Sequence, residues 1–217
     1  MTGIVQAALA ALVITSLWLL GSARPRSCVA AVAFQGIIIG LLPLILGSEA
    51  PAWRLALQAA LSFVLKGVVF PLLLTRAIRS TRAHSEAEPA IGYSASLLAG
   101  VVLIAASLWI GSRLPAAAAE RPALLVPATL FTAFTGLFLV VARTSAIVQV
   151  LGYLALENGI SAFGMALAER EPLLVEMGTF LDAFAAVFVM GITVFRIGRQ
   201  FDHLDADRLS ELRDWPP

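Results

Sequence analysis

Residues 144–168 read TSAIVQVLGYLALENGISAFGMALA, and Glu157 is the one charged side chain among them. At a rise of about 1.5 Å per residue, a helix of this length crosses about 30 Å of hydrocarbon. The apolar run is continuous and does not alternate every second residue, which favours a helix over a strand of a membrane barrel. The stretch therefore predicts a membrane-spanning helix with a glutamate near its middle.

The composition of the whole chain agrees with a membrane protein. Of its 217 residues, 59% are hydrophobic and 13% are charged, whereas soluble domains average about 25% charged residues. The mean hydropathy is +0.90. A formal net charge of +1 gives no reason to expect a nucleic-acid partner. The single cysteine, Cys28, excludes an internal disulfide and provides no zinc or iron–sulfur spacing.

Seven apolar runs, each closed by a charge, proline or glycine, predict an all-α polytopic membrane protein with about seven transmembrane helices. The first has no preceding basic residue, so we expect a retained helix rather than a cleaved signal peptide. The predicted spans are Gly3–Leu20, Ser27–Leu46, Trp53–Ile78, Ile91–Ser112, Pro122–Val141, Thr144–Ala168 and Pro172–Phe195.

The arginines predict the orientation of these spans. If the N-terminus lies outside, ten arginines fall on the cytoplasmic side and four on the other, as the positive-inside rule requires. The ten are Arg24, Arg26, Arg76, Arg79, Arg82, Arg143, Arg196, Arg199, Arg208 and Arg213; the four are Arg54, Arg113, Arg121 and Arg170. The C-terminus is then cytoplasmic, and the tail after Phe195 is either a short amphipathic helix that docks on a neighbour or a disordered segment.

The third predicted span carries a lysine near its middle. Gln58, Ser62 and Lys66 follow one another at intervals of four, which places them on one face of a helix, and Pro71 loosens the backbone just beyond. A charge at this depth costs roughly 2.5–3.5 kcal/mol on insertion scales, so Lys66 needs a partner, water or a task. Two interpretations stay open, a role in ion transport and a buried ammonium that only fixes helix packing.

The sixth span repeats this arrangement around Glu157. Gln149, Tyr153, Glu157 and Ser161 also follow at intervals of four, and Asn158 stands beside them. A buried carboxylate whose charge is opposed by burial and favoured by a nearby cation is suited to a proton relay. The alternative is a polar contact between helices, to which Gly152, Gly159 and Gly164 would contribute close approach.

The seventh span holds two acids. Asp182 lies near mid-depth, whereas Glu176 lies about one turn inside the span and admits a partly hydrated, interfacial position. Six residues separate them, which turns them about 120° apart around the helix, and Thr179 lies between. We therefore expect them to face different neighbours. His84 and His203 fall in a loop and the tail and are interpreted as surface residues.

Three runs near the C-terminus resemble component E of hydrogenase-4, a membrane subunit of energy-converting group 4 [NiFe]-hydrogenases. They are RTSAIVQVLGYLALENGISAFG, PLLVEMGTFLDAFAAVFVMGI and FDHLDADRLSELRD, and the segments GYLALENGI and VEMGTFLD are the most specific. The KGVVFP pattern of the third span and the seven-span layout also resemble that family. The last three spans are similar to the K subunit of bacterial complex I and the C subunit of multi-subunit cation/proton antiporters.

The resemblance implies three parts: four N-terminal transmembrane helices in 1–121, a three-helix unit like the complex I K subunit in 122–197, and a cytoplasmic tail in 198–217. It implies that Glu157 is the first ion-path acid and that Asp182, or less well Glu176, is the second. No cofactor is then expected in this chain, because the NiFe and iron–sulfur centres would lie in partner subunits. The partners implied are antiporter-like and anchor subunits, a peripheral hydrogenase-type module and the bilayer.

The leading hypothesis is a non-redox membrane-arm subunit in the cell inner membrane, in which Lys66, Glu157 and Asp182 contribute to a proton or Na⁺ path. A scaffold of the membrane arm is the second hypothesis, in which the same polar groups are contacts between helices. A subunit of an antiporter-like complex without redox activity is a third. A stand-alone transporter is least favoured, since no pair of broken half-length helices is visible in the sequence.

Overall fold

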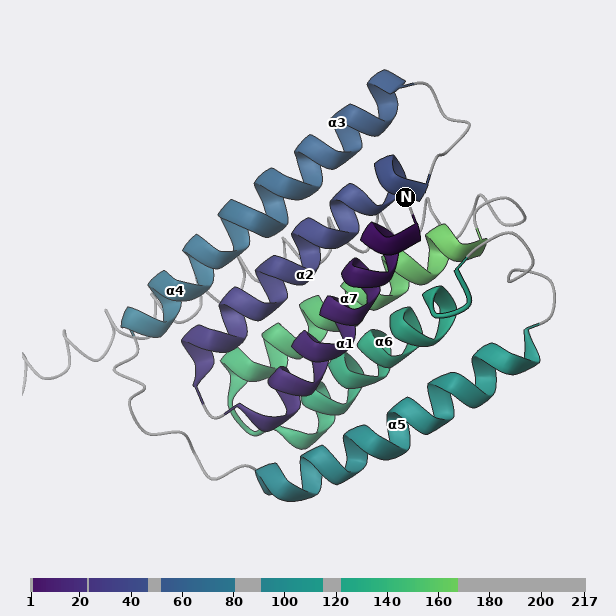
Figure 1. Cartoon of the computed structure of the whole chain (residues 1–217). Helices are drawn as coiled ribbons and strands as arrows, with labels where there is room; N and C mark the ends of the chain where they lie inside the picture. Colours follow the sequence, from purple (N-terminus) through teal and green to yellow (C-terminus); the bar gives the residue numbers. More distant parts are fainter. Residues whose placement is uncertain (1, 23, 47–51, 81–90, 115–121, 168–217) are drawn as a thin grey trace, which may run out of the picture.

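In a computed structural model, the chain forms a bundle of antiparallel helices (Figure 1). The structure describes residues 2–22, 24–46, 52–80, 91–114 and 122–167. Every element within them is a helix: α1 (Thr2–Gly21), α2 (Pro25–Leu46), α3 (Ala52–Ser62), a π-helical segment (Phe63–Val69), α4 (Phe70–Ser80), α5 (Tyr93–Arg113), α6 (Leu125–Ala142) and α7 (Ala146–Leu167). The predicted span Pro172–Phe195 and the tail lie outside the described residues.

The apolar runs decide where these helices begin and end. Five stretches of the described chain are long and apolar enough to cross a membrane, by length and composition. They fall in α1, α2, the continuous rod formed by α3, the π-helical segment and α4, and in α5 and α6. The prediction of an all-helical, polytopic membrane protein is confirmed. The total of seven spans, the outside N-terminus and the three-part division stay predictions.

Helix α7 is 22 residues long, and it forms at the place predicted for the sixth span. Helix α7 is not one of those five apolar stretches. Its polar residues, Gln149, Glu157 and Asn158, lower its hydropathy relative to the other spans. A helix of this kind is stable in a membrane when its polar face is turned toward other helices. In agreement, Glu157 and Asn158 are each only 1% exposed.

Helices α6 and α7 pack with their backbones almost in contact. A Cβ atom added to Gly159 would lie 2.6 Å from the Ala133 Cα, and one added to Gly152 would lie 2.9 Å from the Gly136 carbonyl oxygen. Only a hydrogen fits in such spaces, which is the usual reason for small residues at membrane helix contacts. The predicted packing role of Gly152 and Gly159 is therefore confirmed. Gly164 is also buried, on the same helix.

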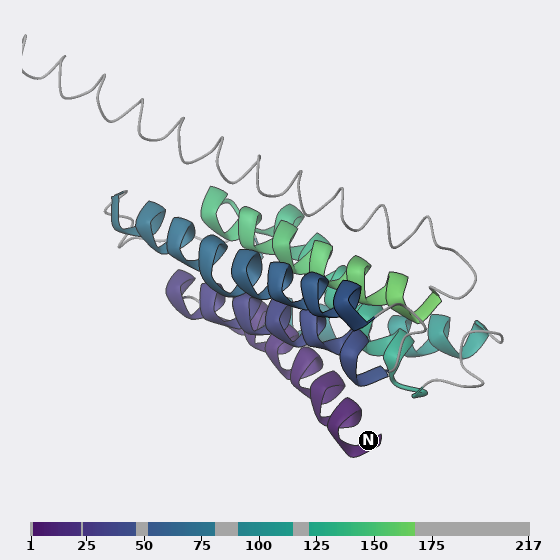
Figure 2. The same cartoon turned by 90° about the horizontal axis from the view of Figure 1, so that it is seen from above.

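The remaining helices surround this pair. Helix α1 packs against α2, α5 and α6, and α2 packs against α7 and the α3–α4 rod. Figure 2 shows the rod running beside α2. The glycines of the sequence GIIIG, Gly36 and Gly40, permit this second close contact. A Cβ atom at Gly36 would be 2.6 Å from the Lys66 Cβ, and one at Gly40 would be 2.7 Å from the Ser62 Oγ.

The buried side chains form two apolar clusters, one toward each end of the bundle. One lies where α1 ends and α2 and α7 begin, and includes Leu20, Val29 and Leu151. The other lies toward the opposite end and includes Leu9, Leu42 and Ala162. Along α1, α2 and α7, the buried polar residues fall between these two groups of positions. The polar groups therefore form a layer near mid-height of the bundle.

Candidate functional site

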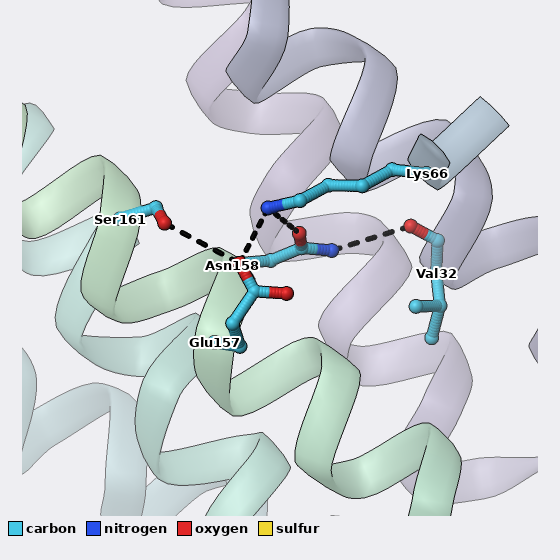
Figure 3. Close-up of polar contacts among 5 residues, drawn as sticks. All are labelled: Val32, Lys66, Glu157, Asn158 and Ser161. Carbon is cyan, nitrogen blue, oxygen red and sulfur yellow. Dashed lines mark hydrogen bonds and ion pairs between the residues drawn. The ribbon is translucent and has the colours of Figure 1, made fainter. Parts of the chain in front are cut away.

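Two buried charges of the described chain, on different helices, form an ion pair. The Lys66 Nζ donates to the Glu157 Oε1 at 2.5 Å and to the Asn158 Oδ1 at 3.1 Å (Figure 3). The side chain of Lys66 is 6% exposed and that of Glu157 is 1% exposed. The two residues are 91 positions apart in sequence. Two of the predicted site residues, each in a different span, are therefore partners.

Hydrogen bonds from neighbouring residues extend the pair across three helices. The Asn158 Nδ2 donates to the Val32 carbonyl of α2 at 3.3 Å. The Ser161 Oγ, one turn after Glu157, donates to the Glu157 Oε1 at 3.4 Å. Figure 3 shows Asn158 between Lys66 and Val32. The π-helical segment, α2 and α7 are thus joined at one level by a network whose charges neutralise one another.

Local backbone structure explains why Lys66 reaches this position. The π-helical segment containing it ends directly before Phe70 and Pro71. Proline has no N–H and its ring collides with the carbonyl four residues earlier, so a membrane helix widens locally to satisfy the freed groups. The predicted loosening at Pro71 takes the form of a π-helix. The methylene groups of Lys66 then lie directly over Gly36.

A small cavity adjoins the ion pair. Its volume is about 10 Å³, which is close to the space that one water molecule requires. Three polar residues of the network contribute to its wall, Lys66, Glu157 and Asn158, and the other lining side chains are apolar: Val29, Val32, Ala33, Phe70, Pro71, Leu74 and Leu154. A water there would touch both charges. The site thus offers a titratable acid, a titratable base and room for a single water.

The other predicted site residues divide into three groups. Ser62 contacts α2 at Gly40, on the side of the rod that also presents Lys66. Gln149 lies elsewhere, where its Nε2 donates to the Arg143 carbonyl at 2.8 Å, and the partly buried Tyr153 packs against the apolar cluster near that end. Gln58 lies on α3. Glu176, Thr179 and Asp182 are outside the described residues, so their participation stays a prediction.

Arg143 has a role that the sequence did not indicate. It was counted only as an orientation signal, yet it is 5% exposed and lies between α6 and α7. Its Nη2 donates to the Leu20 carbonyl at 2.8 Å, its Nη1 donates to the Ile91 carbonyl at 3.3 Å, and its guanidinium lies 4.6 Å from the Tyr93 ring centroid. A cation is favourable at the C-terminal end of a helix. Arg143 therefore joins the end of α1 to the start of α5.

A second polar group was also missed in the sequence. The Gln35 Nε2 of α2 donates to the Thr15 Oγ1 at 3.0 Å and to the Ser16 Oγ at 3.1 Å, both on α1. The Ser16 Oγ lies 3.3 Å from the Thr132 Oγ1 on α6. Gln35, Ser16 and Thr132 are all fully buried. The available signal was Gln35 itself, a lone amide near the middle of a long apolar run.

The described residues contain no group of three His, Cys, Asp or Glu side chains that could hold a metal ion. His84 and His203 lie outside them. The network around Lys66 presents an ammonium, an amide and one carboxylate. This donor set is suited to holding and moving a proton.

Comparison with known proteins gives consistent relatives. The chain is 33% identical over 216 residues to an uncharacterized protein of Mycobacterium tuberculosis, covering 97% of this chain and 96% of that protein. It is 30% identical over 204 residues to hydrogenase-4 component E of Escherichia coli and of Shigella flexneri, covering 93% of this chain and 94% of each relative. No family model and no solved structure matches the chain.

Proposed function

Because this chain belongs to the hydrogenase-4 component E family, we propose that it is a non-redox membrane-arm subunit of a hydrogenase-type, complex I-related assembly. In this proposal it contributes Lys66 and Glu157 to a path for protons or cations. The buried ion pair is the observation that carries the proposal. Two charges buried near the middle of the bundle cost free energy. We therefore expect them only where they serve helix packing or transport.

The geometry supports a mechanism that needs no large helix movement. Lys66 and Glu157 are in direct contact, so a proton taken up by Glu157 removes the negative charge that holds the ammonium. The affinity of Lys66 for its own proton then changes, because two groups this close titrate as a pair. A water in the adjoining cavity would carry the proton to or from the pair. When Glu157 and Lys66 lose and gain a proton in alternation, one proton passes through the pair in each cycle.

The wider assembly follows from the same proposal. Electron transfer would take place in partner subunits that hold the NiFe and iron–sulfur centres. This chain would lie in the cell inner membrane beside antiporter-like and anchor subunits. Asp182 or Glu176 would supply the second acid of the path.

The variant Glu157→Gln tests the proposal. It keeps the size and hydrogen-bonding capacity of the side chain and removes its proton-binding charge. In the whole complex reconstituted in vesicles, we expect assembly and hydrogen turnover to persist while coupled proton movement is abolished. Ser107→Ala is the matched control, since Ser107 is buried on α5 and, in the part of the chain that the structure describes, its hydroxyl bonds within that helix, to the Leu103 carbonyl. Pumping at the wild-type rate by Glu157→Gln would refute the proposal.

The close glycine contacts favour a scaffold as the second candidate function. Gly136, Gly152 and Gly159 bring α6 and α7 together, and Gly36 and Gly40 bring α2 against the rod. In a scaffold, the polar groups would only hold helices together, at about 0.6 kcal/mol per hydrogen bond. The scaffold predicts that Glu157→Gln leaves pumping almost intact, while larger residues at these glycines prevent assembly.

A further inference from the structure

We infer that Gln35, Ser16, Thr15 and Thr132 form a second, hydrated station of the ion path, on a different face of α2 from the one that contacts Lys66. The inference rests on the proposed function. It extends the path laterally, from the contact between the rod and α7 to the contact between α1 and α6.

The first support is the hydrogen-bond balance of this group. Both N–H groups of Gln35 are used, by Thr15 and Ser16. The Thr15 hydroxyl is 2.7 Å from the Ala11 carbonyl, and the Thr132 hydroxyl is 2.9 Å from the Ala128 carbonyl. The Ser16 hydroxyl has two acceptors, the Leu12 carbonyl at 2.8 Å and the Thr132 Oγ1 at 3.3 Å.

These bonds leave the Gln35 Oε1 buried and without a donor among the described residues. Turning the amide over would leave its nitrogen without an acceptor instead, so the need for one more partner does not depend on the orientation of the amide. A buried amide group of this kind requires a partner, and a water molecule supplies both a donor and an acceptor. The Thr135 Oγ1, three residues beyond Thr132 on α6, is likewise buried without a partner in the described chain.

The second support is the position of this group next to the ion pair. Gln35 and Gly36 are consecutive residues of α2, about 100° apart around the helix. Gly36 lies under the methylene groups of Lys66, whereas Gln35 bonds to α1. The Val32 carbonyl, in the same turn, accepts the hydrogen bond of Asn158. One turn of α2 therefore contacts the Lys66–Glu157 network on one face and carries Gln35 of the second group on another.

The third support is the common level of the two groups. Gln35 lies near the middle of α2 and Thr132 near the middle of α6, just as Glu157 lies near the middle of α7. Apolar clusters close the bundle on either side of this layer. A layer of this kind would guide a proton across the subunit, parallel to the membrane, and would impede leakage along the helices.

Proton transfer through this station balances at each step. A water at Gln35 first accepts the incoming proton and then passes one of its protons to a hydroxyl oxygen. That hydroxyl releases its own proton to the next oxygen, so the water and the hydroxyl both end neutral. Ser16 suits this role, because its hydroxyl can turn between the Leu12 carbonyl and the Thr132 oxygen. Gln35 neither gains nor loses a proton, and acts as a positioning residue for the water.

The test uses the whole complex in vesicles and measures protons moved per hydrogen turnover. Gln35→Met keeps the volume and removes the amide, and Ser16→Ala removes the turning hydroxyl. We expect both to reduce this ratio by about tenfold or more, since positioned proton-transfer groups commonly contribute about a hundredfold in rate. Thr129→Val is the matched control, because Thr129 is equally buried on α6, and within the described residues its hydroxyl bonds to the Leu125 and Val126 carbonyls of its own helix.

Glu157→Gln, measured in parallel, separates the two proposals. Normal ratios in Gln35→Met and Ser16→Ala, with transport lost in Glu157→Gln, would overturn the second station and leave the proposed function standing. A normal ratio in Glu157→Gln would overturn the proposed function. If Gln35→Met fails to assemble, Ser16→Ala decides, because it only removes one hydroxyl oxygen. A merely structural group would lower thermal stability in these variants without changing the ratio.

Discussion

At the scale of single residues, the contact between Lys66 and Glu157 is the central feature. Removing two charges from water costs several kcal/mol for each, and their attraction recovers this only when geometry and further hydrogen bonds are good. Here Asn158 and Ser161 supply those further bonds. Replacing both charges by apolar residues is often neutral or stabilising in proteins. Stability alone therefore gives little reason for this pair.

Lys66→Met and the double variant Lys66→Met/Glu157→Met separate stability from function. The single variant leaves a buried carboxylate beside Asn158 without its ammonium, so we expect the free energy of unfolding to fall by about 3 kcal/mol. The double variant should recover most of this loss, yet transport no protons. Denaturant unfolding in detergent and proton uptake in vesicles measure the two effects. Proton transport by the double variant would contradict this account.

At the scale of helices, close packing by glycine positions the site. The contact of Lys66 with Gly36 fixes where the long side chain crosses α2. We predict that Gly36→Ala displaces the π-helical segment, because the added Cβ would be 2.6 Å from the Lys66 Cβ. Overpacking of this kind commonly costs about 1–3 kcal/mol. Gly3→Ala is the control, since nothing lies within 4 Å of a Cβ there. Equal thermal stabilities of the two variants would contradict the prediction.

The sequence predicted the helices well because long apolar runs have one stable form in a bilayer. Helix α1 and predicted span Gly3–Leu20 differ by one residue at each end. The π-helical form of Phe63–Val69 was not predicted, because it depends on how the rod adapts to Pro71 while packing on α2. Sequence periodicity does show that Ser62 and Lys66 share a face, and both contact α2.

The candidate site was predicted in part. Lys66 and Glu157 stand out as charges in apolar runs, but their pairing depends on a contact between spans that periodicity does not reveal. The sequence places Asn158 beside the polar stripe of Glu157, and in the structure it bonds to Lys66 and to the Val32 carbonyl. Gln35 carries no charge, so a search for charged residues in apolar runs does not find it. Arg143 was classified by its place in a loop, although its side chain is buried.

At the scale of the whole molecule, five of the seven arginines in the described part of the chain lie at one end of the bundle, and Arg54 and Arg113 lie at the other. Arg24 precedes α2, Arg79 lies in the last turn of α4 and Arg143 follows α6. If the positive-inside rule holds, this end is cytoplasmic. Cysteines introduced at Gly3 and Arg24, both exposed and at opposite ends of α1, test this in a Cys28→Ala background. We expect an impermeant thiol reagent to label Gly3→Cys from outside and Arg24→Cys only in inverted vesicles. The opposite pattern would reverse the topology.

The central claim is that Glu157 binds and releases a proton during turnover. Infrared difference spectroscopy of the working complex measures this directly, through the carboxyl stretching band of a protonated acid. We predict a carboxyl band that appears and disappears through the cycle in the wild type and is missing in Glu157→Gln. Identical difference spectra for the wild type and Glu157→Gln would contradict the claim.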